Sequence, residues 1–107
     1  MKIYIAGKIT GLDEDVAFAE FEAAEGLIAS LGHEPLNPMK LVDQSLGREY
    51  EEYLLDALRI VLIDATAVYF LPNWMDSFGA RIEHAIATER LMPIYNDLFP
   101  PPPVPAS

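Results

Sequence analysis

The chain has 107 residues and a net charge of −10, from 17 acidic against 7 basic side chains, and 51% of its residues are hydrophobic. A chain of this length forms one domain, and a surface this acidic repels nucleic-acid backbones, which excludes a nucleic-acid polymer as partner. The lack of cysteine excludes disulfides and thiol nucleophiles, and no stretch resembles a membrane span or signal peptide, so we expect a cytoplasmic protein.

The first expected strand, residues 2–6, is short, apolar and β-branched, which is typical of a central strand in a parallel sheet. A turn over residues 7–11 follows it, and parallel sheets bind ligands at the carboxyl ends of their strands. The candidate ligand contacts in this turn are Gly7, Lys8, Thr10 and Gly11. An ordinary strand-to-helix turn is the alternative.

Residues 13–31 are expected to form a helix that ends at Gly32. Apolar residues recur along it at steps of three and four, which predicts one buried stripe of Phe18, Phe21, Ala24, Ile28 and Leu31. The second strand, residues 33–38, contains Pro35 and is therefore expected at an edge of the sheet. Asn37 lies at its carboxyl end, facing the same crevice as the first turn, whereas His33 lies at the other end and is expected to be exposed.

Residues 39–48 show no periodicity and are expected to be a loop, and a helix is expected over residues 48–63. Its predicted buried stripe is Tyr50, Leu54, Ala57, Leu58 and Val61. Residues 64–71 are almost continuously apolar, as in a strand covered on both faces. Trp74, in the loop that follows, either caps the core or stacks on a planar ligand.

A last helix is expected over residues 78–90 and a fourth strand over residues 92–95. The tail contains four consecutive prolines, which form neither a helix nor a ladder strand. It is predicted to be either disordered or an extended arm on a neighbouring subunit. We therefore divide the chain into an α/β domain, residues 1–96, and a proline-rich tail, residues 97–107.

The alternation of four strands and three helices predicts a three-layer, flavodoxin- or Rossmann-like α/β fold. We expect a parallel sheet of strand order 2-1-3-4 with helices on both faces. The switch point then lies between the first and third strands, where the turn over residues 7–11 and the loop over residues 73–79 converge.

Glu83 is the one carboxylate inside a helix that begins at this crevice. The turn around Ser77 and Gly79 offers backbone N–H groups and a hydroxyl, which stabilise a nearby anion. An ionised carboxylate beside a sugar can stabilise an oxocarbenium-like transition state or attack the anomeric carbon. The alternative is a surface glutamate paired with Arg90 or Lys8.

The segments 3–11, 36–38, 68–74 and 77–83 together resemble the nucleoside 2-deoxyribosyltransferase-like superfamily, and most closely a short, uncharacterised bacterial and phage branch of it. The resemblance covers residues 2 to about 95. It implies that Glu83 is the nucleophile that attacks C1′ of a nucleoside or nucleoside 5′-monophosphate, and that Tyr4 lies beside it. It also implies a small-molecule ligand and a homodimer or larger homo-oligomer.

By the same resemblance, the first turn lines the sugar or the 5′ end of the ligand. Ser77 stands where transferases on nucleosides carry Asp and where hydrolases of 5′-monophosphates carry Ser, so Ser77 with Lys8 and Thr10 favours a phosphorylated ligand. Asp76 takes the role of that Asp only if the loop shifts by one residue. No cofactor and no metal ion is expected.

One position departs from the superfamily pattern: Thr66 stands where relatives carry an Asp near the start of the third strand, and this puts transfer activity in doubt. We therefore weigh an N-glycosidic bond hydrolase or (deoxy)ribosyltransferase against a nucleotide-binding module without catalysis, and against an interaction protein on the same fold.

Overall fold

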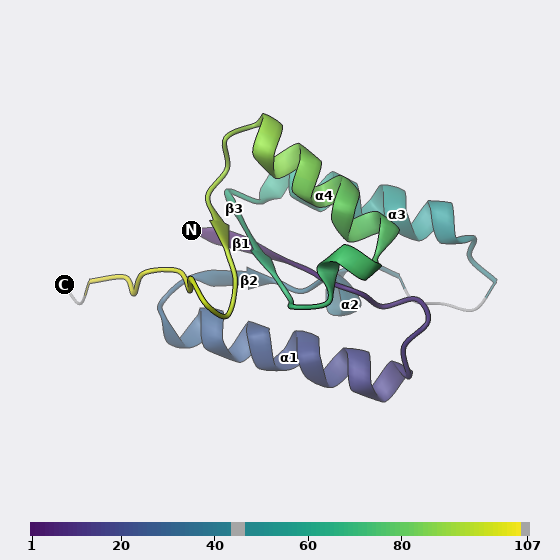
Figure 1. Ribbon diagram of the computed structural model, residues 1–107, viewed down its shortest axis with the longest axis horizontal. Coiled ribbons are helices and arrows are strands. Elements are labelled where there is room, and N and C mark those ends of the chain that lie inside the picture. The colour runs from purple at the N-terminus through teal and green to yellow at the C-terminus, as the bar shows by residue number, and fades with distance from the viewer. Residues whose placement is uncertain (44–46, 106–107) are drawn as a thin grey trace.

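The computed structural model describes residues 1–43 and 47–105, and a parallel sheet lies between two layers of helices (Figure 1). The strands are β1 (Lys2–Ala6), β2 (Glu34–Leu36), β3 (Ala67–Phe70) and β4 (Ile94–Tyr95). Each pairing is parallel and the order is β2-β1-β3-β4, which confirms the predicted class and strand order. The proline-containing β2 lies at an edge, as predicted.

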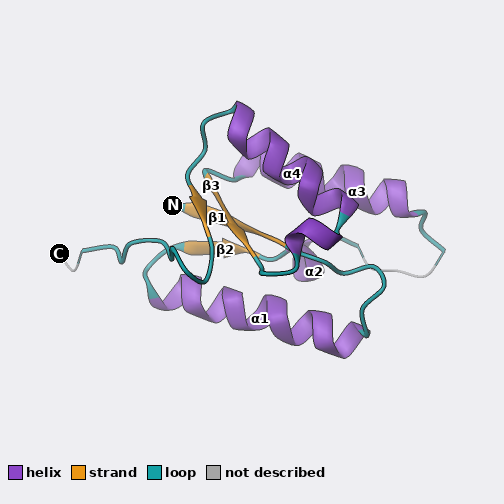
Figure 2. Ribbon diagram, viewed as in Figure 1, coloured by secondary structure: helices purple, strands orange, loops and turns teal. Residues whose placement is uncertain are grey.

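The helices are α1 (Glu14–Ser30), α2 (Pro38–Leu41), α3 (Tyr50–Arg59) and α4 (Phe78–Glu89). Helix α1 covers one face of the sheet, and α3 and α4 cover the other (Figure 2). A π-helical turn, η1 (Ile60–Asp64), extends α3, and a short 3₁₀ turn, η2 (Trp74–Asp76), precedes α4. Within the described ranges, none of these helices combines the length and apolarity that crossing a membrane requires.

Strand β1 builds both cores of the molecule, because successive side chains of a strand point to opposite faces. Ile3 and Ile5 pack with α1 residues such as Phe21. Tyr4 and Ala6 pack on the other face, among residues of α3 and α4. Since β1 is central, both faces are closed to solvent, and Ile3, Tyr4, Ile5 and Ala6 are all buried.

Helix α1 begins where predicted, and Phe21, Ala24 and Ile28 of the predicted stripe are buried. Asp13 caps it by accepting a hydrogen bond from the Asp15 backbone N–H at 2.9 Å. Its buried residues are Ala17, Phe21, Ala24 and Ile28. The prediction that Phe18 is buried is wrong: it is 40% exposed, with Lys40 Nζ lying 5.7 Å from its ring centroid. The stripe at steps of four and three starts at the small Ala17, so Phe18 is turned toward solvent.

Residues 38–41 form a helical turn where we expected a loop. The Asn37 Oδ1 accepts a hydrogen bond from the Met39 backbone N–H at 3.0 Å, and Pro38 occupies the first helical position. Asn followed by Pro is thus a helix start here and not only the end of a strand. Residues 44–46 of the predicted loop lie outside the described residues.

The described part of the tail lies on its own chain, which neither expectation anticipated. The Val104 backbone N–H donates to the Leu31 carbonyl at 2.8 Å, and Pro101 is buried. The prediction that His33 is exposed is wrong: its Nδ1 lies 3.0 Å from the Met1 amine and its Nε2 lies 2.6 Å from the Pro102 carbonyl oxygen. The tail and the N-terminus together cover this imidazole.

Candidate functional site

Glu83 lies in the interior, between α4 and β1. Ser77 begins α4 as its cap, because the Ser77 Oγ accepts a hydrogen bond from the Ala80 backbone N–H at 3.1 Å. The buried face of α4 consists of Gly79, Ala80, Glu83 and Ala87, at helical spacing. Glu83 is 4% exposed, so the alternative of a surface glutamate paired with Lys8 or Arg90 does not hold.

The Glu83 carboxyl group meets the Tyr4 side chain of β1. The Tyr4 hydroxyl hydrogen-bonds this carboxyl group, and the Tyr4 ring is itself 2% exposed. Burial raises the pKa of Glu83 from an ordinary value of 4.5 to about 8, against the Tyr4 hydrogen bond, which lowers it. Burial, and next the charge of Glu83, raise the pKa of Tyr4 well above its ordinary value. The pair therefore holds a proton near neutral pH.

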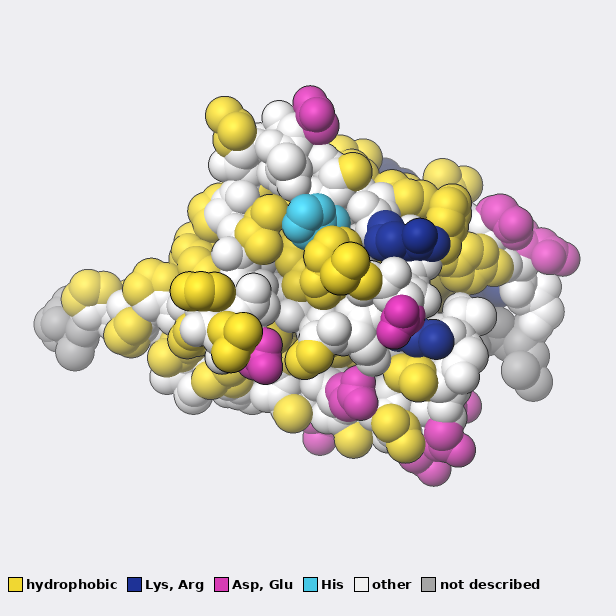
Figure 3. All heavy atoms as spheres, in the orientation of Figure 1, with side chains coloured by type: hydrophobic (Ala, Val, Ile, Leu, Met, Phe, Trp, Pro, Cys, Tyr) yellow, Lys and Arg dark blue, Asp and Glu magenta, His cyan; other side chains and the backbone are white. Residues whose placement is uncertain are grey.

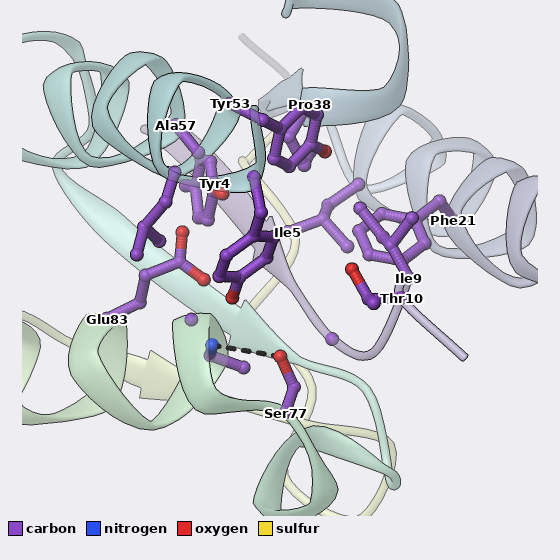
Figure 4. Close-up of a pocket in the computed structure, with 15 residues that line it drawn as sticks. Tyr4, Ile5, Ile9, Thr10, Phe21, Pro38, Tyr53, Ala57, Ser77 and Glu83 are labelled. Atoms are coloured by element: carbon purple, nitrogen blue, oxygen red, sulfur yellow. Dashed lines mark hydrogen bonds between the residues drawn. The ribbon is translucent and has the colours of Figure 1, made fainter. Parts of the chain in front are cut away.

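A narrow cavity of about 30 Å³ adjoins this pair. Figure 4 shows that residues from β1, the turn after it, α3 and α4 line it. The predicted site residues that line it are Tyr4, Gly7, Thr10, Ser77, Gly79 and Glu83. These residues come from distant parts of the sequence, and the structure brings them together at one place.

The turn over residues 7–11 reaches the cavity because Gly7 allows close packing. A Cβ on Gly7 would lie 2.6 Å from the Leu71 Cδ1, so only glycine fits between β1 and the end of β3. The Lys8 backbone N–H donates to the Asn73 Oδ1 at 3.1 Å, which ties the turn to the loop before α4. The Lys8 Nζ would lie 3.9 Å from a Cβ on Gly11, so this amine folds over its own turn.

The remaining predicted site residues lie outside the cavity. Asn37 is buried as the cap of α2, and Lys8 and Gly11 do not line the cavity. Trp74 stacks on His84, with ring centroids 4.3 Å apart, and packs against the core, which favours its role as a core cap. Asp76 lines a separate outer hollow, next to Ser77.

Thr66 lies at the opposite end of the sheet from the turn over residues 7–11. Its backbone N–H donates to the Lys2 carbonyl at 2.8 Å, and its Oγ1 accepts from the Lys2 N–H at 3.0 Å. Since Lys2 begins β1 and Gly7 follows its end, the Thr66 side chain is remote from the cavity in this fold. Thr66 is therefore not among the residues that line the described cavity.

Among the lining residues that were not anticipated as part of the site are Tyr50, Tyr53 and Leu54 of α3. The periodicity placed Tyr50 and Leu54 in a stripe buried against the sheet, yet Tyr50 is 38% exposed. Helices that follow parallel strands begin at the carboxyl edge, so α3 and α4 both start beside the crevice. Two tyrosines in the first turns of such a helix are the sequence signal that could have identified this part of the site.

Acidic side chains outnumber basic ones on the face of the molecule shown in Figure 3, and the net charge of the chain is −10. Hydrophobic side chains lie between them, over the region of η2 and α4. Met75 of η2 and Phe78 of α4 are 67% and 57% exposed. Figure 3 also shows basic side chains beside this hydrophobic region.

Residues 1–96 match the family described as a domain of unknown function, DUF4406. The chain belongs to this family. In structure, the DUF4406 chain is similar to a 2-deoxyribosyltransferase from the psychrotolerant bacterium Bacillus psychrosaccharolyticus, with a TM-score of 0.67 and 19% sequence identity. The match covers 90% of this chain and 71% of that one, and it shows a shared fold. No curated protein matches the sequence.

Proposed function

We propose that this DUF4406 protein breaks or exchanges the N-glycosidic bond of a nucleoside or nucleoside 5′-monophosphate, with Glu83 as nucleophile. The observation that carries the proposal is the buried Glu83 carboxyl group, hydrogen-bonded by Tyr4 beside a cavity at the carboxyl edge of β1. The fold shared with a 2-deoxyribosyltransferase supports the same reaction class.

In this reaction a Glu83 oxygen attacks C1′ of the sugar while the bond from C1′ to the base nitrogen breaks. The base leaves with the electron pair of that bond and takes up a proton from water. Water or the nitrogen of a second base then attacks C1′ of the glycosyl ester and releases the Glu83 carboxylate. Tyr4 orients the carboxyl group through its hydroxyl, which is a positioning role.

The nucleophile must be ionised, and this determines how the rate depends on pH. Because the pKa of Glu83 is raised to about 8, the carboxylate is the minor form at neutral pH. The rate of base release is therefore expected to rise with pH and to level off above about pH 8. Glu83 must also be ionised when a substrate has displaced water from the cavity.

The charges around the cavity favour an uncharged nucleoside over its 5′-monophosphate. Of the residues implied to hold a phosphate, Thr10 and Ser77 line the cavity, but Lys8 does not. The outer hollows are lined by the acidic Asp43, Glu49 and Asp76, and Arg48 lies among them. Arg48 is already paired with Asp56 at 2.6 Å and Glu52 at 3.6 Å.

A panel of ribo- and deoxyribonucleosides and their 5′-monophosphates, assayed for free base by chromatography, tests the proposal. Glu83→Gln should abolish base release, by about a thousand-fold or more. Glu89→Gln, on the exposed end of the same helix, is the matched control and should retain full activity. Release of base that continues unchanged in Glu83→Gln would overturn the role of Glu83.

A nucleoside-binding module without catalysis is the second candidate. The closed cavity and the protonated Glu83 favour it, since neither suits a nucleophile in its reactive state. A nucleoside that raises the melting temperature but is recovered intact after long incubation would establish this function instead.

The proposal includes a cytoplasmic homodimer or larger homo-oligomer. Light scattering after size exclusion measures the assembly, and a monomer at all concentrations would remove this part of the proposal alone.

A further inference from the structure

Glu83 is closed off from any ligand in the described arrangement. The cavity beside it, about 30 Å³, has room for roughly one water molecule. A sugar ring cannot touch the carboxyl group unless a wall of this cavity moves. Strand β1 and the sheet beneath are fixed by ladder hydrogen bonds, so the movable wall is the one formed by α3.

The contact that closes this wall is made by two side-chain ends against the first turn of α4. A Cβ on Gly79 would lie 3.1 Å from the Leu54 Cδ1 and 3.2 Å from the Tyr50 hydroxyl oxygen. Both side chains therefore rest on the Gly79 backbone, and the absence of a Cβ there allows the approach. The wall is closed by side chains and not by a continuous backbone.

Two outer hollows of about 280 Å³ each flank the same tyrosine. One lies between Tyr50, Tyr53 and Arg48, and the other between Tyr50, Asp76 and Phe78. Tyr50 and Thr10 line both hollows and also the inner cavity. Each hollow is slightly below the range of about 300 to 1,000 Å³ that is usual for small-ligand sites. Joined, the two hollows reach that range.

We propose that Tyr50 is the gate of this site: its side chain swings away from Gly79, joins the two hollows with the inner cavity, and so admits a nucleoside to Glu83. The choice of a nucleoside as the ligand rests on the proposed function. The movement of Tyr50 rests on the packing alone. Tyr50 is 38% exposed and stands in the first turn of α3, so a change of its rotamer displaces few buried atoms.

Leu54 does not take this role, although it touches the same glycine. It lines the inner cavity but neither of the outer hollows, so its movement opens no path to them. Tyr53 lines one outer hollow only. Thr10 lines all three spaces, as Tyr50 does, but of these two residues it is Tyr50 whose side chain rests on Gly79.

The first test measures access to Glu83 without any ligand. In Tyr50→Ala, water reaches the carboxyl group, so the pKa of Glu83 should fall by about one unit or more, as followed by carbon NMR of labelled glutamate. Labelling of Glu83 by a water-soluble carbodiimide and an amine, read by mass spectrometry, should become about ten-fold faster or more. Tyr50→Phe keeps the ring and should leave both readouts near the wild-type values.

The control is Tyr95→Ala, a half-buried tyrosine on β4, which should change neither readout. Gly79→Ala is a second way to open the gate, because the added methyl group displaces the Tyr50 hydroxyl and the Leu54 methyl by a few tenths of an ångström. It should move the labelling rate in the same direction as Tyr50→Ala, by a smaller factor. An unchanged Glu83 pKa and labelling rate in both variants would overturn the gate.

The second test uses deoxyadenosine and deoxycytidine as probes. Either probe, once bound, should protect Glu83 of the wild-type protein from the carbodiimide. The rate at which the probe associates with the protein should be several-fold higher in Tyr50→Ala. If Tyr50→Ala exposes Glu83 but neither probe binds, the gate stands and the nucleoside function fails. If the probes bind wild type and Tyr50→Ala at the same rate, with Glu83 equally reactive, the gate fails and the function stands.

Discussion

The two faces of the sheet are built from the same strands but differ in kind. On the α1 face, Ile3 and Ile5 of β1 meet Phe21 and Ile28, and the buried residues of this core are hydrophobic, with Tyr69 among them. On the opposite face, Tyr4 meets Glu83, and both polar groups are almost as inaccessible as the isoleucines. A shift of one residue along β1 thus separates an apolar core from a titratable pair.

Both faces are stabilised by apolar burial, but only the second also holds a buried carboxyl group, which costs stability when it is ionised. Apolar burial favours folding by about 25 cal/mol for each Å² removed from water. An isolated buried carboxyl group does the opposite, because its charged form loses hydration. Stability on the α1 face should therefore be independent of pH, whereas stability on the Glu83 face should depend on it.

Glu83→Gln should produce the largest effect, and it should stabilise the protein. The pKa of Glu83 is about 8 in the folded state against 4.5 ordinarily, so the folded state holds the proton more tightly than the unfolded one. The contribution of Glu83 to the free energy of unfolding is fully present below about pH 4.5 and is lost as the pH rises through 8. Glu83→Gln avoids this loss, so its free energy of unfolding should exceed that of wild type by on the order of 5 kcal/mol at about pH 9.

Urea unfolding at about pH 5 and pH 9 measures this difference. The Glu89→Gln control, at the exposed end of α4, should track wild type at both values. Equal stability of Glu83→Gln and wild type throughout this range would show that Glu83 is hydrated or paired in solution.

Phe21→Ala should cause the next largest change, a destabilisation of about 4 kcal/mol. Phe21 is fully buried on the α1 face, and its truncation leaves a cavity among residues that have no polar group to gain. The loss should be equal at acid and alkaline pH. Phe18→Ala on the same helix is the control and should cost about 0.5 kcal/mol, because Phe18 is largely exposed.

Tyr4→Phe should raise the pKa of Glu83 above 8, by about one unit, because the hydrogen bond that lowers it is removed. The pH at which base release reaches half its maximum should move upward by the same amount. Carbon NMR of the Glu83 carboxyl group gives the pKa directly. Tyr69→Phe, on the opposite face, should leave it unaltered, and a fall of the Glu83 pKa in Tyr4→Phe would contradict the pairing.

Ser77→Ala should have the smallest effect, a destabilisation of about 1 kcal/mol, because it removes the cap of α4. Ser77→Asp keeps an acceptor for the Ala80 N–H and should therefore be as stable as wild type. Thermal unfolding followed by circular dichroism measures both variants. Failure of Asp to restore stability would show that the Ser77 hydroxyl acts through something other than the cap.

The sequence predicts the sheet well because strand order depends on local signals and on the handedness of connections. Short apolar runs, Gly32 and Pro35 were enough for the order β2-β1-β3-β4. The placement of Glu83 beside Tyr4 followed from the resemblance alone. The helical turn over residues 38–41 was not predicted, because Asn before Pro can end a strand or start a helix equally well.

The closure over Glu83 could not be predicted, because it depends on how two helices meet. Periodicity indicates which side of α3 is apolar, but not that Tyr50 and Leu54 rest on Gly79 and not on the sheet. His33 shows the same limit: it is buried by segments 32 and 69 residues away in sequence. Contacts of this range carry no local signal.

The imidazole of His33 also brings the N-terminal and C-terminal segments of the domain close together. One ring nitrogen meets the Met1 amine and the other meets the carbonyl of Pro102, three residues before the end of the described chain, so the two terminal segments meet at one side chain. A short peptide linker between those ends would therefore span little distance. The domain is suited to circular permutation, in which the chain is opened at a surface turn and joined at its former ends.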